Sequence, residues 1–256
     1  MQFLLDHPWP FGVFTATLLA LCLEAGRYTA ARSRIQEDQH RKDQTIALRD
    51  GLFVLVSLLL GFTLALAAAR YSERRTLMID ESNAIGVAYL RAETLATPTS
   101  SNAQLLLRQY VDARLEEDAA GLDLARAAQA DRRVKQLQAQ LWQTSVDVTK
   151  TDRSAVAAAY LAALTQVIDF HEKRLASFEN RVPLSVWLLI FFVSAIAVFN
   201  RGLTLARRFW LTVLLAPLTI AITVTLIADL DTPNSGFIRI DQRPMLRLQA
   251  DIQSPQ

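Results

Sequence analysis

The feature that most constrains this chain is a run of 19 residues without a charge, from Gly51 to Ala69 (GLFVLVSLLLGFTLALAAA). At 1.5 Å per residue, an α-helix of that length spans about 29 Å, which is the thickness of a bilayer's hydrocarbon core. A water-soluble domain would have to bury every side of such a helix, whereas a membrane accepts it on all sides. The run therefore predicts a membrane-spanning helix.

Three further apolar blocks lie at Pro10–Leu23, Pro183–Phe199 and Phe209–Leu230, and they explain the positive mean hydropathy of +0.20. The first block is about 14 residues long, less than the roughly 20 that a span needs. Asp6 stands before it where a signal peptide carries basic residues, and no small-residue cleavage site follows. We therefore interpret this block as an uncleaved membrane helix.

Between the second and third blocks the chain is polar and amphipathic, with Gly86, Pro98 and Gly121 as its only glycines and prolines between Tyr71 and Asn180. Apolar residues recur there at helical spacing, which predicts helices and not a sheet. The predicted helices are 72–96, 102–119, 122–149 and 153–180. Their apolar stripes need partners, so a bundle is expected.

The predicted fold class is all-α: an integral membrane protein with four transmembrane helices in two pairs, flanking a long helical extramembrane domain. The predicted segments are a first membrane helix (1–26), a basic polar connector (27–49), a second membrane helix (50–70), the helical domain (71–182), the third and fourth membrane helices (183–230) and a polar tail (231–256). The side of the membrane stays open, because nine Lys and Arg residues lie near the spans on each side.

Several function classes find no support in the sequence. The net charge is +2 and no basic stripe with interleaved aromatic residues occurs, which argues against nucleic-acid binding. Cys22 is the single cysteine, and no metal-ligand motif, nucleophile motif or phosphate-binding glycine loop is present. We therefore predict no enzyme, cofactor or metal.

Two groups of polar residues in the helical domain have competing interpretations. His171 continues an apolar stripe, so we interpret it as a packing residue of the bundle. The acidic residues Asp80, Glu81, Glu116, Glu117 and Asp118 are compatible with a cation site, but we interpret them as a solvated helix face.

The second block carries two lines of residues at spacing four. Val54, Leu58 and Phe62 form a bulky apolar line, and small residues form another at Gly61, Ala65 and Ala69. Bulky residues facing an axis and small ones facing neighbouring helices would make a hydrophobic gate in an oligomeric pore. The alternative is ordinary lipid-facing and packing surface.

A longer motif begins in the second block with Leu60-Gly61-Phe62 and continues with Arg70-Tyr71 and then Glu73-Arg74-Arg75. This motif is similar to the bestrophin neck helix, and the chain resembles the bestrophins and the bacterial bestrophin-like membrane proteins. The bestrophin-like resemblance also rests on the segments containing Asp80, Glu81, Asn83 and Gly86, and on the turn Asp231-Thr232-Pro233 with Gly236. These motifs cover about 40 residues, and the layout of two spans, a helical domain and two spans extends to nearly the whole chain.

The resemblance implies a homo-oligomeric, pentameric channel for chloride and similar inorganic anions in a cell membrane, the inner membrane of a bacterium. By position, the neck residues would be Val54, Leu58 and Phe62. Arg70, Arg74 and Arg75, repeated around an axis, would attract anions at the mouth or else anchor the helix to lipid headgroups. The acidic run that binds calcium in animal bestrophins is missing after Asp231, so calcium gating is not implied.

A second function hypothesis is a non-conducting membrane sensor or adaptor, whose helical bundle binds a ligand or a partner protein. Only 26 residues follow the fourth apolar block, which leaves no room there for an output domain.

Overall fold

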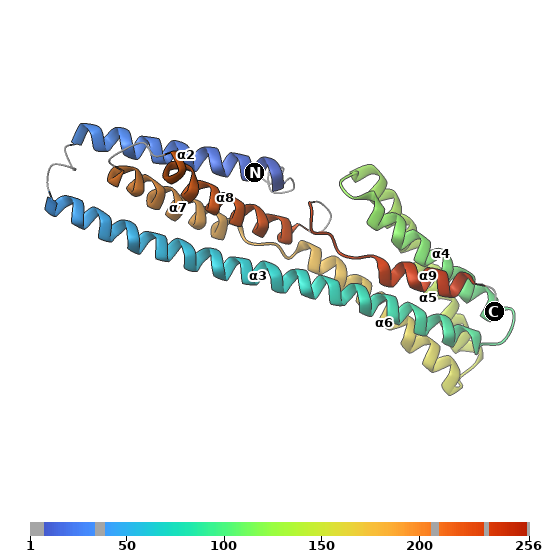
Figure 1. The fold of residues 1–256 in the computed structure, drawn as a ribbon. Coiled ribbons are helices and arrows are strands. Elements are labelled where there is room, and N and C mark those ends of the chain that lie inside the picture. The colour runs from blue at the N-terminus through green and yellow to red at the C-terminus, as the bar shows by residue number, and fades with distance from the viewer. Residues whose placement is uncertain (1–7, 34–38, 206–209, 233–235, 255–256) are drawn as a thin grey trace. The chain divides into compact units, whose positions relative to one another are not determined.

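The computed structural model describes residues 8–33, 39–205, 210–232 and 236–254, and these residues form helices without a strand (Figure 1). The helices are α2 (Pro8–Ser33), α3 (Gln39–Glu93), α4 (Thr99–Ala120), α5 (Leu124–Thr151), α6 (Ala155–Glu179), α7 (Leu184–Thr204), α8 (Trp210–Asp231) and α9 (Arg243–Gln253). The all-α prediction is confirmed for this part of the chain.

The chain divides into two compact units. The membrane unit comprises residues 1–70 and 181–238, and the bundle unit comprises residues 71–180 and 239–256. Helix α3 runs through both, so one 55-residue helix supplies the second apolar block and the first helix of the bundle. Each unit has its own core.

The membrane unit contains α2, α7, α8 and the first part of α3. Four helical stretches of the described chain are long and apolar enough to cross a membrane, and they contain the apolar parts of α2, α3, α7 and α8. The core of this unit includes Phe11, whose ring meets the edges of Trp187 and Phe191. The polar connector predicted at 27–49 is mostly helical, because α2 continues to Ser33 and α3 begins at Gln39.

Helices α2 and α7 approach closely where two glycines meet. A Cβ atom on Gly26 would overlap the carbonyl oxygen of Phe199, and one on Gly202 would overlap that of Leu23. Small residues that let two backbones touch are a common means of helix association in membranes. This contact fixes α2, which contains the shortest of the predicted apolar blocks, against α7.

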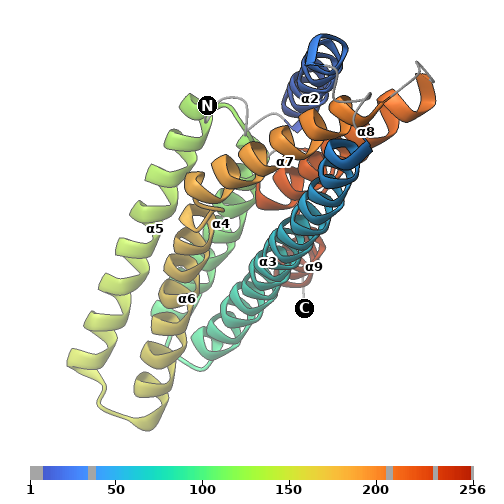
Figure 2. The same cartoon turned by 90° about the vertical axis from the view of Figure 1, so that its left-hand side faces the viewer.

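The bundle unit contains the second part of α3 together with α4, α5, α6 and α9, and in it α5 packs against α4 and α6, and α9 against α4. Its core is apolar and includes Ile85, Leu107, Val134 and Leu164. Figure 2 shows α5 and α6 side by side, joined by a short turn at Ser154, whose hydroxyl accepts the N–H of Ala157 and caps α6. The helices predicted at 102–119, 122–149 and 153–180 correspond to α4, α5 and α6.

The predicted polar tail contains a helix that the sequence analysis does not anticipate. In α9, Met245 and Ile252 are seven residues apart, so both lie on one face, and both are buried in the core of the bundle unit. The amides of Gln249 and Gln253 donate to Asp112 of α4. The last part of the chain thus belongs to the bundle.

We predict that Gly26→Ala lowers the stability of the protein by about 1–3 kcal/mol, because the added methyl group meets backbone that cannot move aside. Thermal unfolding in detergent measures the loss. Gly51→Ala is the matched control, since a Cβ at Gly51 meets nothing within 4 Å. Equal melting temperatures for the two variants would contradict the close α2–α7 contact.

Candidate functional site

The three predicted neck residues share one exposed face of α3. Val54 is 70% exposed, Leu58 52% and Phe62 67%, although the opposite side of the same helix buries Val56 and Leu60 in the membrane unit. Contacts among the described residues leave this face largely uncovered, so lipid or other protein must cover it in a membrane. The structure thus leaves these side chains available to line a pore, without itself forming one.

The predicted small-residue line lies on that same face. Gly61, Ala65 and Ala69 each follow a neck residue by seven positions, which is two helical turns less about 20°. All three are exposed. The two lines therefore lie on one face of α3, whose side chains are bulkier toward Val54 and smaller toward Ala69. The sequence analysis had placed the bulky and the small residues on two separate faces.

The three arginines predicted at the mouth differ in their surroundings. Arg70 pairs with Asp231, with 3.5 Å between Nη1 and Oδ1. Arg74 is buried and donates to the carbonyl oxygens of Ser177 and Asn180, each at 3.1 Å. Arg75 is exposed. Two of the three thus hold the chain together, and Arg75 alone is presented to solvent.

Two buried aspartates at the end of α8 organise the turn that carries the second part of the family-like motif. Asp231 accepts the N–H of Val182 through both oxygens, at 3.1 and 3.0 Å, just before α7 begins. Asp229 accepts the N–H groups of Phe237 and Ile238 at 2.8 and 3.0 Å. Gly236 has φ of +105°, and a Cβ there would overlap Asp229. Pro233, the remaining residue of this motif, lies outside the described residues.

The first part of the motif leads to a buried cluster of charges in the bundle unit. Asp80 is half-buried, Asn83 is exposed and Gly86 contacts Leu248 of α9, but Glu81 is fully buried. The carboxylate of Glu81 lies between two buried guanidinium groups. Its oxygens are 2.8 and 3.1 Å from Nε and Nη2 of Arg114, and 3.1 Å separates Oε2 from Nε of Arg174.

The cluster joins three helices through five charges and a histidine. Arg174 of α6 contacts Glu117 and Asp118 of α4, each at 3.1 Å, and Arg114 also contacts Glu117. Nδ1 of His171 lies 3.4 Å from Oε1 of Glu81. Among the described contacts of this cluster, Glu81 is the only acidic group from α3, and both arginines form ion pairs with it.

Electrostatics in the cluster act in opposite directions on its acids. Burial alone would raise the pKa of Glu81, but Arg114, a hydrogen bond with His171, and Arg174 together hold it well below its usual range. Burial raises the pKa of Asp118 despite the same two arginines. The two arginines and three carboxylates carry a formal sum of −1, so Asp118 holds the charge that is least compensated.

The sequence analysis interpreted Glu81, Glu117 and Asp118 as a solvated face, and the structure shows that this was wrong. Their partners, Arg114 and Arg174, were missed. A signal was present, because Arg114 precedes Glu117 and Asp118 by three and four residues on one helix. His171 is buried as predicted, though it also contacts Glu81. No three His, Cys, Asp or Glu side chains are grouped to hold a metal in the described ranges.

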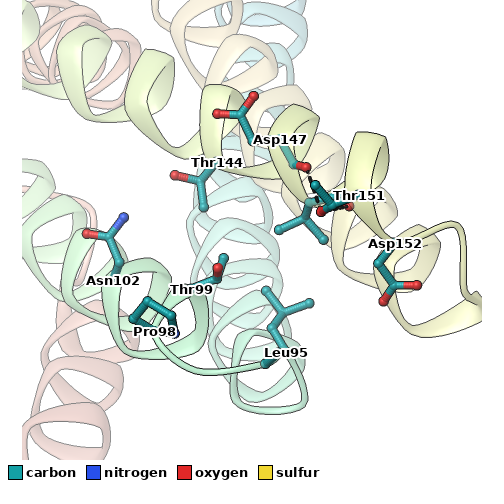
Figure 3. A pocket seen from close by; sticks show the side chains of 10 residues that line it. Leu95, Pro98, Thr99, Asn102, Thr144, Asp147, Thr151 and Asp152 are labelled. Carbon is teal, nitrogen blue, oxygen red and sulfur yellow. Dashed lines mark hydrogen bonds between the residues drawn. The ribbon is translucent and has the colours of Figure 1, made fainter.

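The bundle unit also has an open cleft of about 530 Å³ where the α3–α4 connection meets the end of α5 (Figure 3). Its lining is mixed, with Leu95 and Val148 at the apolar side and Asn102, Asp147 and Asp152 at the polar side. Asp147 accepts a hydrogen bond from Gln143 at 3.0 Å. A small polar or cationic ligand would match this lining.

We predict that Glu81→Gln destabilises the protein by about 3–5 kcal/mol, because it removes the fully buried carboxylate that lies between the two buried arginines. Asp118→Asn removes an excess negative charge and keeps an acceptor for Arg174, so its loss should be about 1 kcal/mol. Melting temperatures in detergent compare the two variants. A larger loss for Asp118→Asn would contradict the central place of Glu81.

A family model described as a bestrophin-like domain matches residues 13–245 of the chain. No curated protein and no solved structure matches it. The match includes most of both units, and together with the four apolar helices it identifies a multi-pass membrane protein.

Proposed function

The chain belongs to the bestrophin-like family, and from this membership we propose that it is a homo-oligomeric channel that conducts inorganic anions through a neck formed by α3. The family match supports a channel-type membrane protein and not an enzyme. The observation that carries the finer proposal is the exposed face of Val54, Leu58 and Phe62 on the longest helix of the chain. A cell membrane is the proposed location, the inner membrane if the host is a bacterium.

Several copies of α3 around an axis would cover this face and explain its composition. Rings of Phe62 and Leu58 would form a narrow apolar constriction, which gates by excluding water. Weakly hydrated anions would cross such a constriction at lower cost than strongly hydrated ions. Ala65 and Ala69 follow Phe62 along α3, and their small side chains would widen the path beyond the constriction, within which Gly61 lies. Five copies is the number that the bestrophin resemblance implies.

In this proposal, the mouth of the channel has fewer anion-attracting arginines than the sequence analysis expected. Arg70 is paired with the carboxylate of Asp231, which offsets its charge, and Arg74 is buried against carbonyl oxygens of the chain, so neither side chain is placed to meet an anion directly. Arg75 is exposed, and its repetition around an axis would raise the local concentration of anions. Selectivity would therefore depend mainly on the apolar neck.

The cleft in the bundle unit favours a second candidate function, a membrane sensor or adaptor that does not conduct. In that case the exposed face of α3 would contact lipid or a partner helix, and neck substitutions would leave ion flux unchanged. The flux measurement below distinguishes the two functions.

We predict that Phe62→Ala increases anion flux several-fold in liposomes containing the purified protein, because the smaller side chain widens the constriction and lets it hydrate. The control is Phe192→Ala on α7, since Phe192 is 66% exposed and matches Phe62 in type and exposure. Efflux of chloride measured with an ion-selective electrode reports both.

Two outcomes would contradict the channel. One is a wild-type protein that carries no anions under any ionic condition, and the other is an equal change in the flux of an active preparation by Phe62→Ala and Phe192→Ala. Mass measurement of the protein–detergent complex provides a separate check, since a monomer has no central axis.

A further inference from the structure

The turn between α4 and α5 exposes two leucines at its tip. Leu124 is 85% exposed and Leu122 about half exposed, on either side of Asp123. The turn is well defined, because Asp123 accepts the N–H groups of Ala125 and Arg126, each at 3.1 Å, and Gly121 has a positive φ. Two large apolar side chains at the tip of a helical hairpin are unfavourable in water, so we expect a partner to cover them.

Contacts inside the bundle unit place this turn at one end of the bundle. Arg108 bonds Tyr89, and Arg114 bonds Glu81, so α4 runs opposite to α3. Leu122 lies eight residues beyond Arg114 and is therefore level with about position 73 of α3, given the equal rise of the two helices. The tip is at the end of the bundle where α3 enters.

Helix α6 reaches the same end. Arg91 of α3 bonds the carbonyl oxygen of Ala159, and Arg74 bonds those of Ser177 and Asn180, so α6 also runs opposite to α3. The chain thus enters the bundle unit after Arg70 and leaves it after Asn180 at one end. Along the chain, the uncharged stretch of α3 comes just before this end, and α7 begins four residues after Asn180.

The two ends of the bundle differ in composition. The turns at the other end read TPTSS at 97–101 and TDRS at 151–154. The end where the chain meets its membrane helices has the leucine pair, and the exposed charged residues there include the basic Arg75, Arg126 and Arg239 and the acidic Glu73, Asp123 and Glu179. Apolar side chains beside basic ones suit the boundary between headgroups and acyl chains of a bilayer.

We propose that the α4–α5 turn is an interfacial anchor, and that Leu122 and Leu124 insert into the surface of the bilayer that the chain spans. The partner is the lipid surface itself. The anchor would attach the bundle unit to the membrane at a third point, besides α3 and the segment that leads to α7. This role holds whether or not the chain conducts ions.

Site-specific fluorescence tests the anchor on the full chain in lipid nanodiscs. Cysteines replace Leu122 or Leu124 in a Cys22→Ser background, and each carries an environment-sensitive nitrobenzoxadiazole label. Leu105→Cys is the matched control, because Leu105 is an exposed leucine of α4 that lies about 25 Å from Leu122 along the helix axis. All three positions are exposed, so the label should not disturb the fold.

Nitroxide-bearing lipids should quench most of the emission at positions 122 and 124 and leave position 105 unchanged, whereas iodide in the buffer should do the reverse. Iodide quenching at 122 and 124 as strong as at 105 would place the turn in water and overturn the proposal. Protection from both quenchers would show that protein, such as a second copy of the chain, covers the leucines, and would overturn it as well.

Discussion

The structure depends on one constraint: α3 must pack against its own chain on one side and against lipid or other protein on the other. In the membrane unit this helix buries Val56, Leu60 and Ala67 and exposes Val54, Leu58 and Phe62. Its backbone is fully hydrogen-bonded within the helix, so the exposed side costs nothing in lipid. What covers that side decides whether the protein is a channel or another kind of membrane protein.

Polar contacts fix α3 on its buried side in each unit. Asp231 holds Arg70 and the backbone just before α7, which ties α3 to two other elements of the membrane unit. In the bundle unit, Glu81 joins α3 to Arg114 and Arg174. Breaking a buried pair leaves an uncompensated charge, so these contacts resist small displacements of the helix. The rotation of α3 about its axis, and with it the exposed face, is thereby determined.

Much of the fold follows from sequence because its signals are local. The uncharged run Gly51–Ala69 and the helical spacing of the middle region depend on neighbours in the chain, and both were predicted. The long-range partners were not. No pattern near Glu81 in the sequence predicts its ion pair with Arg174. Likewise, no pattern in the polar tail predicts that Met245 and Ile252 are buried in the core of the bundle unit. The neck residues were selected by spacing alone, which finds a face of a helix but not what lies opposite it.

The central claim is that copies of α3 surround an ion path and turn Leu58 toward it. Leu58→Cys in a Cys22→Ser background, reconstituted in liposomes, tests it with a negatively charged methanethiosulfonate reagent. The claim predicts that the reagent abolishes most of the anion flux, and that Phe192→Cys, at an exposed position of α7 instead of α3, is unaffected. An active Leu58→Cys protein whose flux is unchanged after confirmed modification would contradict it.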